Sequence, residues 1–246
     1  MLTSNDIVTL WEAALSKNYW HKAILLLAAA HPTIAMNEFS LLSIGQRNTK
    51  LFRFRDSLFG SDIEAHSQCP KCAEKVEFQL DSQVICDPNV PVWDGGERSI
   101  DIDNHQIICR PPTCYDLEMI APYLEVEDEE GAAYALMKAC VFQWLVDGVY
   151  TPIDAMPISL VEQVSQHIKT LDPHSEIVCR LACPECEHSW GEPFDIANFL
   201  WHEIDNKAQI ILSEVQLLAR AFGWWEGDIL SLSDVRRKYY IEQLHE

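Results

Sequence analysis

The chain of 246 residues is long enough for one large domain or two smaller ones, and its 48% hydrophobic and 23% charged residues are typical of a folded, soluble protein. The longest apolar run, residues 23–30, is much shorter than the ~20 residues of a membrane-spanning helix. Residues 1–6 lack the basic region of a secretory signal. We therefore expect a cytoplasmic protein with no direct membrane span.

The net charge of −20 is concentrated in the middle of the chain. Residues 61–200 hold 26 of the 38 acidic residues but only 7 of the 18 basic residues. Nucleic-acid binding depends on clustered Lys and Arg that neutralise phosphates, so this acidic region would repel DNA or RNA. The charge distribution therefore argues against nucleic acid as a partner.

Residues 1–60 are predicted to form a helical N-terminal part. The first helix has Thr3 or Ser4 as its N-cap, the second covers residues 20–30 and ends at Pro32, and the third covers residues 43–59 and ends at Gly60. In the first helix the apolar residues recur at helical spacing: Ile7, Leu10, Trp11, Ala14 and Leu15. The third helix carries basic residues at three-residue spacing, Arg47, Lys50 and Arg53, which we interpret as a solvated face in preference to a docking stripe.

Two nearly identical cysteine motifs are the strongest signal in the sequence: Cys69-Pro70-Lys71-Cys72 and Cys183-Pro184-Glu185-Cys186. Two such knuckles supply the four thiolates of a tetrahedral structural zinc site. We therefore predict one Zn²⁺ bound by Cys69, Cys72, Cys183 and Cys186, with no coordination position left for catalysis. His66 and His188 are close enough to substitute but are expected to be bystanders, and the other five cysteines are assigned to packing.

The knuckles define the expected domain organisation. Residues 76–80 and 177–181 alternate apolar and polar side chains beside the two knuckles, which predicts two strands lying side by side in one ribbon. The zinc ribbon would be split between residues 61–81 and 176–194. An inserted α/β module, residues 82–175, would fill the gap and have adjacent ends.

The inserted module is predicted to start with a Pro- and Gly-containing loop over residues 88–96, followed by a hairpin over residues 100–109 that turns near residues 103–105. Helices are expected at residues 115–124 and 132–146. The acidic run between them, residues 125–130, lacks the spacing of a calcium loop and is interpreted as a solvated linker.

Residues 195–246 are predicted to form a helical C-terminal part that can pack on the N-terminal helices. Asp195 is the N-cap candidate of a first helix with apolar residues from 196 to 200, and a second, longer helix with apolar residues from 208 to 222 ends at Gly223. Ser233 can cap a last helix. Trp224, Trp225, Arg236 and Arg237 are residue types that are enriched in interfaces, which makes them candidate partner-binding residues. The alternative is that the tryptophans belong to the core.

The sequence contains no motif of a catalytic machinery. Phosphate-binding loops, dinucleotide-binding turns, zinc-protease His pairs and nucleophile elbows are all missing. We therefore expect a protein that is not an enzyme and has no small-molecule substrate. The expected fold class is α+β, with helical parts around a split four-cysteine ribbon that carries an inserted module.

A series of ordered motifs resembles the T-even phage baseplate hub protein family over nearly the whole chain. In the first half the motifs are Leu42-Ser43-Ile44-Gly45-Gln46-Arg47, Leu58-Phe59-Gly60, the first knuckle, Arg110-Pro111-Pro112-Thr113 and Asp116-Leu117. In the second half they are the second knuckle with His188-Ser189-Trp190, Phe199-Leu200-Trp201-His202-Glu203-Ile204, Glu214-Val215, Leu218-Ala219, Phe222-Gly223-Trp224, Ile229-Leu230-Ser231-Leu232, Arg236-Arg237 and Tyr239-Tyr240.

The resemblance implies a non-enzymatic structural or assembly component of the baseplate of a phage-like contractile tail or injection system. Its partners would be other baseplate and tail proteins, and it would be either cytoplasmic in the producing cell or incorporated into the particle. Three alternatives stay open: a transient assembly factor, a dithiol redox enzyme that uses the two C-P-x-C motifs, and a nucleic-acid adaptor built on the ribbon.

Overall fold

The computed structural model describes residues 2–244, which form a mixed helical and β fold with small sheets. The N-terminal part contains four helices: α1 (Ser4–Ala14), α2 (Tyr19–Ala30), α3 (Met36–Ser40) and α4 (Ile44–Phe59). Thr3 caps α1 by accepting a hydrogen bond from the Asp6 backbone, and Ser43 caps α4 in the same way through Gln46. Gly60 ends α4 at a φ of 90°, which glycine adopts without strain. The three expected helices are confirmed, and α3 is an addition.

The C-terminal part is built on one long helix, α9 (Ile196–Phe222), followed by α10 (Glu226–Ser231) and α11 (Asp234–Glu242). The two separate helices expected before Gly223 are continuous, because no Gly or Pro interrupts residues 196–222 and the buried apolar spacing runs through Leu200, Ile204, Ala208 and Ile211. Asp195 caps α9, and Gly223 ends it in the left-handed conformation at a φ of 70°.

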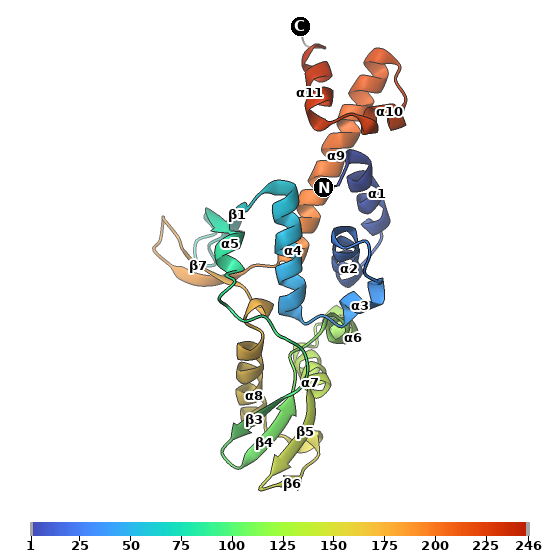
Figure 1. Ribbon diagram of the computed structural model, residues 1–246. Coiled ribbons are helices and arrows are strands. Elements are labelled where there is room, and N and C mark those ends of the chain that lie inside the picture. The colour runs from blue at the N-terminus through green and yellow to red at the C-terminus, as the bar shows by residue number, and fades with distance from the viewer. Residues whose placement is uncertain (1, 245–246) are drawn as a thin grey trace.

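The N-terminal helices and α9 share a core, as expected. Leu26 and Leu27 of α2 and Leu51 of α4 are fully buried together with Leu200 and Ile204 of α9. Further along α9, Ile7 and Val8 of α1 pack in a second cluster with Ile211, Leu218 and Ile229. In Figure 1, α9 runs past α4 and α1 toward α10 and α11. The two ends of the sequence therefore form one helical unit.

Each cysteine knuckle lies in the turn of its own antiparallel hairpin. The first hairpin consists of β1 (Asp62–Gln68) and β2 (Lys75–Asp81), which leads into the short helix α5 (Ser82–Ile85), and the second consists of β7 (Val178–Ala182) and β8 (Ser189–Pro193). The predicted pairing of residues 76–80 with residues 177–181 is wrong, because the two strands belong to separate two-stranded sheets. A knuckle turn joins its two flanking strands directly, so each strand pairs with its nearest neighbour in sequence.

The inserted region contains a four-stranded sheet in the order β3-β4-β5-β6, formed by β3 (Arg98–Ile102), β4 (His105–Cys109), β5 (Val141–Val146) and β6 (Val149–Tyr150). The hairpin of β3 and β4 is confirmed. Helices α6 (Cys114–Glu125) and α7 (Glu129–Cys140) precede β5. The helix predicted over residues 132–146 is wrong in its second half, where the β-branched and aromatic residues of Val141–Val146 add a strand to β4.

An amphipathic helix, α8 (Ile158–Leu171), lies between the short 3₁₀ turns η1 (Ile153–Ala155) and η2 (Pro173–Ser175) and was not predicted. Its buried residues Leu160, Val164 and Ile168 pack in one cluster with Ile107 and Trp144 of the sheet. The sheet and the helices α10 and α11 lie at opposite ends of the molecule (Figure 1). Within residues 2–244, no helix combines the length and the apolar character needed to cross a bilayer.

Several polar contacts fasten the inserted region to the N-terminal end of α4, and two of them involve the segment around η2. The backbone N–H of Gly45 donates to the buried Asp172 carboxylate at 2.8 Å, and the Asn48 side chain donates to the carbonyl of His174 at 2.9 Å. A Cβ atom at residue 45 would collide with the Asp172 carboxylate, so only glycine permits this approach. Burial raises the pKa of Asp172, while the N–H of Gly45 opposes that shift.

The predicted solvated basic face on α4 is wrong for Arg47. Arg53 is exposed and Lys50 is half-buried, whereas Arg47 is only 4% exposed. On the side of Arg47, α4 packs between α2 and the inserted region. The spacing of residues along one helix does not indicate which of its faces other elements will cover.

Arg237 is fully buried and joins the two ends of the chain. Its guanidinium donates to Glu214 of α9 at 2.8 Å, to Ser4 of α1 at 2.8 Å and to the carbonyl of Leu232 at 2.7 Å. It also donates to Asp234 at 2.6 Å. Although burial acts in the opposite direction, Lys207 and Arg237 hold the pKa of Asp234 at about 2. The role expected for Arg237 on a docking surface is therefore wrong, because its side chain has no exposed area.

We predict that Arg237→Ala destabilises the fold by about 3–5 kcal/mol, because it leaves the Glu214 carboxylate, whose side chain is only 12% exposed, without its cation. The adjacent Arg236 is exposed, so Arg236→Ala should change the free energy of unfolding by less than about 0.5 kcal/mol. Denaturant unfolding of both variants measures the difference. Equal stabilities would contradict the structural role of Arg237.

Candidate metal centre

The first knuckle is a tight turn between β1 and β2. The backbone N–H of Cys69 donates to the carbonyl of Glu74 at 2.9 Å, and the N–H of Ala73 donates to the carbonyl of Cys69 at 2.8 Å. Ala73 adopts a left-handed conformation with a φ of 61°. These bonds fold residues 69–74 so that both cysteine side chains point to the same side of the turn.

The second knuckle repeats this backbone arrangement. Cys183 donates to the carbonyl of His188 at 2.9 Å, Glu187 donates to the carbonyl of Cys183 at 3.0 Å, and Glu187 is left-handed with a φ of 56°. Ala73 and Glu187 both follow the second cysteine of their motif. A left-handed non-glycine residue is uncommon, so its recurrence at equivalent positions indicates that the two turns are built for the same purpose.

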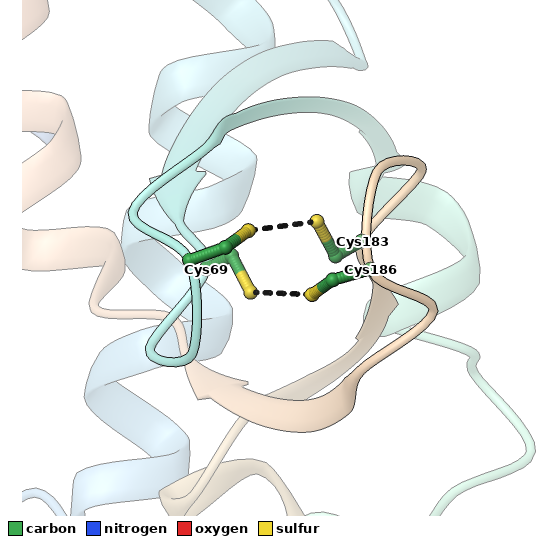
Figure 2. A group of neighbouring side chains, drawn as sticks. Cys69, Cys183 and Cys186 are labelled. Carbon is green, nitrogen blue, oxygen red and sulfur yellow. Dashed lines mark hydrogen bonds between the residues drawn. The ribbon is translucent and has the colours of Figure 1, made fainter.

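The two knuckles face each other and bring all four sulfur atoms within 4.8 Å of one another. The Sγ atoms of Cys69 and Cys186 are 3.6 Å apart, and those of Cys72 and Cys183 are 3.5 Å apart (Figure 2). Four sulfurs at about 2.3 Å from a tetrahedral ion would be separated by about 3.8 Å. The donor set and its spacing therefore fit a metal ion held by four thiolates.

The surroundings of the cluster fix the two hairpins in this position. Cys69 and Cys183 are buried with Val76, and the half-buried Cys186 and Trp190 pack against them, whereas Cys72 is exposed. Glu192 of β8 accepts hydrogen bonds from Ser67 of β1 at 2.7 Å and from Trp190 at 3.0 Å. A polar link thus joins the hairpins beside the sulfur cluster.

The thiols of the first knuckle ionise at different pH. Burial raises the pKa of Cys69, but hydrogen bonds from the backbone N–H groups of Cys72 and Lys71 outweigh it and lower the pKa to about 7. The backbone of Glu74 acts to lower the pKa of Cys72, yet hydrogen bonds with the thiols of Cys186 and Cys183, together with burial, raise it to about 12. The Cys69 thiolate is therefore available near neutral pH, whereas a metal ion must displace the proton of Cys72.

The structure brings together the four cysteines that the motif spacing selected. His66 and His188, which were considered as substitutes, do not belong to the cluster among the described residues. The remaining cysteines lie elsewhere, and burial raises the pKa of Cys109, Cys114 and Cys140 to about 11, 11 and 12. Such thiols stay protonated, in agreement with a role in packing.

The candidate partner-binding residues differ in their exposure. Trp225 is 82% exposed and Arg236 is exposed, while Trp224 is half-buried. Trp224 stacks on Phe222, with ring centroids 4.8 Å apart, and forms a T-shaped pair with Tyr240, with ring centroids 5.0 Å apart. Trp224 thus belongs largely to the packing between α9 and α11, and Trp225 and Arg236 are the two available to a partner.

Comparisons with known proteins identify no relative: no protein-family model, curated protein or solved structure matches the chain.

We predict one metal ion per chain and its loss in Cys72→Ser. Cys72 is exposed, so this substitution would be nearly neutral without a metal. With a metal it should remove several of the roughly 10–16 kcal/mol that such sites contribute to folding. Elemental analysis and denaturant unfolding measure both effects, with Cys86→Ser, outside the cluster, as the matched control. Metal-free wild-type protein, purified without chelator, would refute the site.

Acidification should weaken metal binding. The metal binds thiolates, so the apparent affinity falls with decreasing pH, and it falls more steeply below the Cys69 pKa of about 7, where this sulfur also becomes protonated. Competition with a chromophoric chelator across a pH series measures this slope. An affinity that does not depend on pH would show that the metal is held by groups other than these thiols.

Proposed function

We propose that the chain is a non-enzymatic structural or assembly component of the baseplate of a phage-like contractile tail, which works by docking to other baseplate proteins. The ordered motifs that resemble the baseplate hub family support this role. The observation that carries the docking mechanism is the exposure of Trp225, which has 82% of its surface open to solvent. A large aromatic residue in this state is a typical anchor for a partner protein.

The proposed docking surface is the C-terminal tip, which we define as residues 223–244. Besides Trp225, it exposes Val235 at 78% and Tyr239 at 58%, four residues apart and thus on one face of α11. Arg236 adds an exposed charge. The buried Arg237 side chain holds this surface in place, because its hydrogen bonds connect α11 to α9 and α1. A preorganised surface loses less entropy on association.

We propose that the ion at the four cysteines is a single structural Zn²⁺. Tetrahedral thiolate sites hold either zinc or iron, and four protein ligands leave no position for a substrate. Iron would colour the purified protein, whereas zinc would not. The zinc would then hold the two hairpins together and take no part in a reaction.

The dithiol redox enzyme is the alternative from a different class. It requires disulfide chemistry between the two cysteines of one motif, whereas the short distances of 3.6 and 3.5 Å join cysteines of different motifs. This arrangement favours a ligand set. Disulfide-exchange activity in a metal-free protein would support the redox alternative, and its absence in a zinc-loaded protein would support the structural site.

We predict that Trp225→Ala with Tyr239→Ala reduces incorporation into particles, or binding to isolated baseplate proteins, by at least about tenfold, because each anchor of this kind contributes up to ~2 kcal/mol or more. The free energy of unfolding and the zinc content should stay unchanged, since the side chains of Trp225 and Tyr239 are exposed. Tyr150→Ala, with 62% exposure at the far end of the molecule, is the control.

Quantification of the chain in purified particles tests the prediction and separates a permanent component from an assembly factor that leaves. Normal particle yield and normal binding with the folded double variant would exclude the C-terminal tip as the docking surface.

A further inference from the structure

A cavity of about 570 Å³ lies where the N-terminal helices meet the inserted region. Its walls come from α2, α4, α6, α7 and α8 and from residues 175–177 and 193–195. In Figure 1 these helices occupy the middle and the lower part of the molecule. The volume is within the range of small-molecule sites. The walls are mainly apolar: Ile44, Leu117, Leu136, Met137, Ile168 and Phe194.

One cation, Arg47 of α4, lines this apolar cavity without a carboxylate partner. Its side chain donates to the Asn48 side-chain oxygen, from Nε at 3.0 Å and from Nη2 at 2.9 Å. Among residues 2–244, Arg47 makes no ion pair, although it is only 4% exposed. A buried charge is costly unless an opposite charge compensates it.

The other arginines removed from solvent all have such a partner. Arg55 pairs with Glu203 through two hydrogen bonds of 2.9 and 2.8 Å, and Arg237 pairs with Glu214 at 2.8 Å. The half-buried Arg110 pairs with Asp116. Arg47 is the exception within the described chain, and it is also the one that borders a large cavity.

The acidic groups at the cavity are already engaged. Asp195 accepts hydrogen bonds from Ala197 and Asn198 as the N-cap of α9, at 2.9 and 3.3 Å. Glu176 pairs with Lys169 at 2.6 Å. Arg47 also borders a smaller cavity of about 170 Å³, where Glu118 lies 4.0 Å from His21. None of these carboxylates makes an ion pair with Arg47.

Tyr19 lies beside Arg47 in the wall of the cavity. The guanidinium lies 5.9 Å from the centre of the Tyr19 ring, and Tyr19 also lines the cavity. Burial raises the pKa of Tyr19, and its side chain forms hydrogen bonds with Asp195 and Arg47. The Tyr19 hydroxyl is therefore occupied by protein groups, and Arg47 is the donor that the cavity offers to an acceptor group on a ligand.

We propose that this cavity binds an apolar molecule that ends in a single carboxylate, of the class of the medium-chain fatty acids. The planar guanidinium matches a carboxylate, which would supply the opposite charge that Arg47 lacks. The apolar walls would cover the tail. One unpaired cation suits one negative charge, and the acidic surroundings of residues 61–200 disfavour a more highly charged ligand. This site is independent of the docking surface at the C-terminal tip.

Isothermal titration of the full-length, metal-loaded protein with decanoate tests the proposal. We expect saturable binding of one decanoate per chain. Decanol, which has the tail without the carboxylate, should bind at least about tenfold more weakly, as expected for the loss of a charge-assisted hydrogen bond. Acetate, which has the carboxylate without the tail, should give no measurable binding.

Two variants alter the site in different ways. Arg47→Gln removes the cation and should weaken decanoate binding at least about tenfold, with little effect on decanol. Leu136→Trp fills the cavity from α7 and should weaken both ligands while Arg47 stays in place. Arg53→Gln, an exposed arginine on the same helix, is the matched control and should bind like the wild type. If Arg47→Gln does not fold, Leu136→Trp still tests the cavity.

Three results would overturn the proposal: no decanoate binding by the folded wild-type protein, equal binding of decanoate and decanol, or unchanged decanoate binding in a folded Leu136→Trp variant. A fourth would change the ligand class. If a peptide with an apolar C-terminus bound more tightly than decanoate and its amidated form did not bind, the site would be one for the chain terminus of a partner protein and not for a fatty acid.

Discussion

The contact between the two cysteine knuckles determines how the remaining parts of the chain are placed. Residues 73–182 separate Cys72 from Cys183, yet the two sulfurs are 3.5 Å apart. The first hairpin directly follows α4, and the second directly precedes α9. Holding the hairpins together therefore also holds α4 beside α9. Buried Arg55 and half-buried Glu203 make the same connection by an ion pair, so a metal ion bound by the four cysteines would act on the same junction as this salt bridge.

Buried arginines extend this arrangement along the molecule. Arg55 joins α4, the start of β1 and α9 through Glu203 and the carbonyls of Gly60 and Asp62, and Arg237 joins α1, α9 and α11. Each adds directional hydrogen bonds to the apolar packing between distant elements, which favours a single arrangement of the helices. Arg47 has the same burial and the same position between parts of the chain, but its partner is absent from residues 2–244. The contrast makes a ligand the physically consistent explanation for this charge.

The sequence predicted those features of the fold that depend on residues close together in the chain. Caps and stop residues located α1 and α4, and the motif spacing identified the four cysteines that meet in space. Residues 141–146 were misassigned to a helix because Val141–Val146 becomes a strand only by pairing with β4. Helix α8 was missed although Leu160, Val164 and Ile168 recur at helical spacing, a signal that was available and was not used.

Packing between distant parts of the chain explains why Arg47 and Arg237 were wrongly predicted to be exposed. The sequence shows that Arg47 and Arg237 lie on helices, but their burial depends on what packs against those helices: the inserted region against α4, and α1 with α9 against α11. The same limit applies to the cavity. Its walls come from five helices and from segments at both ends of the second hairpin, so no window of the sequence contains the pattern that would indicate a binding site.

The metal centre and the cavity are linked through the second hairpin. Ile177 precedes β7, Phe194 follows β8, and both line the cavity. The N–H of Phe194 donates to the carbonyl of Ile177 at 2.8 Å, which closes the base of the hairpin opposite the Cys183 turn. An ion that fixes the turn also fixes this base, and with it one wall of the cavity. Metal binding and ligand binding would then stabilise the same arrangement of the hairpin, so thermodynamic linkage makes each favour the other.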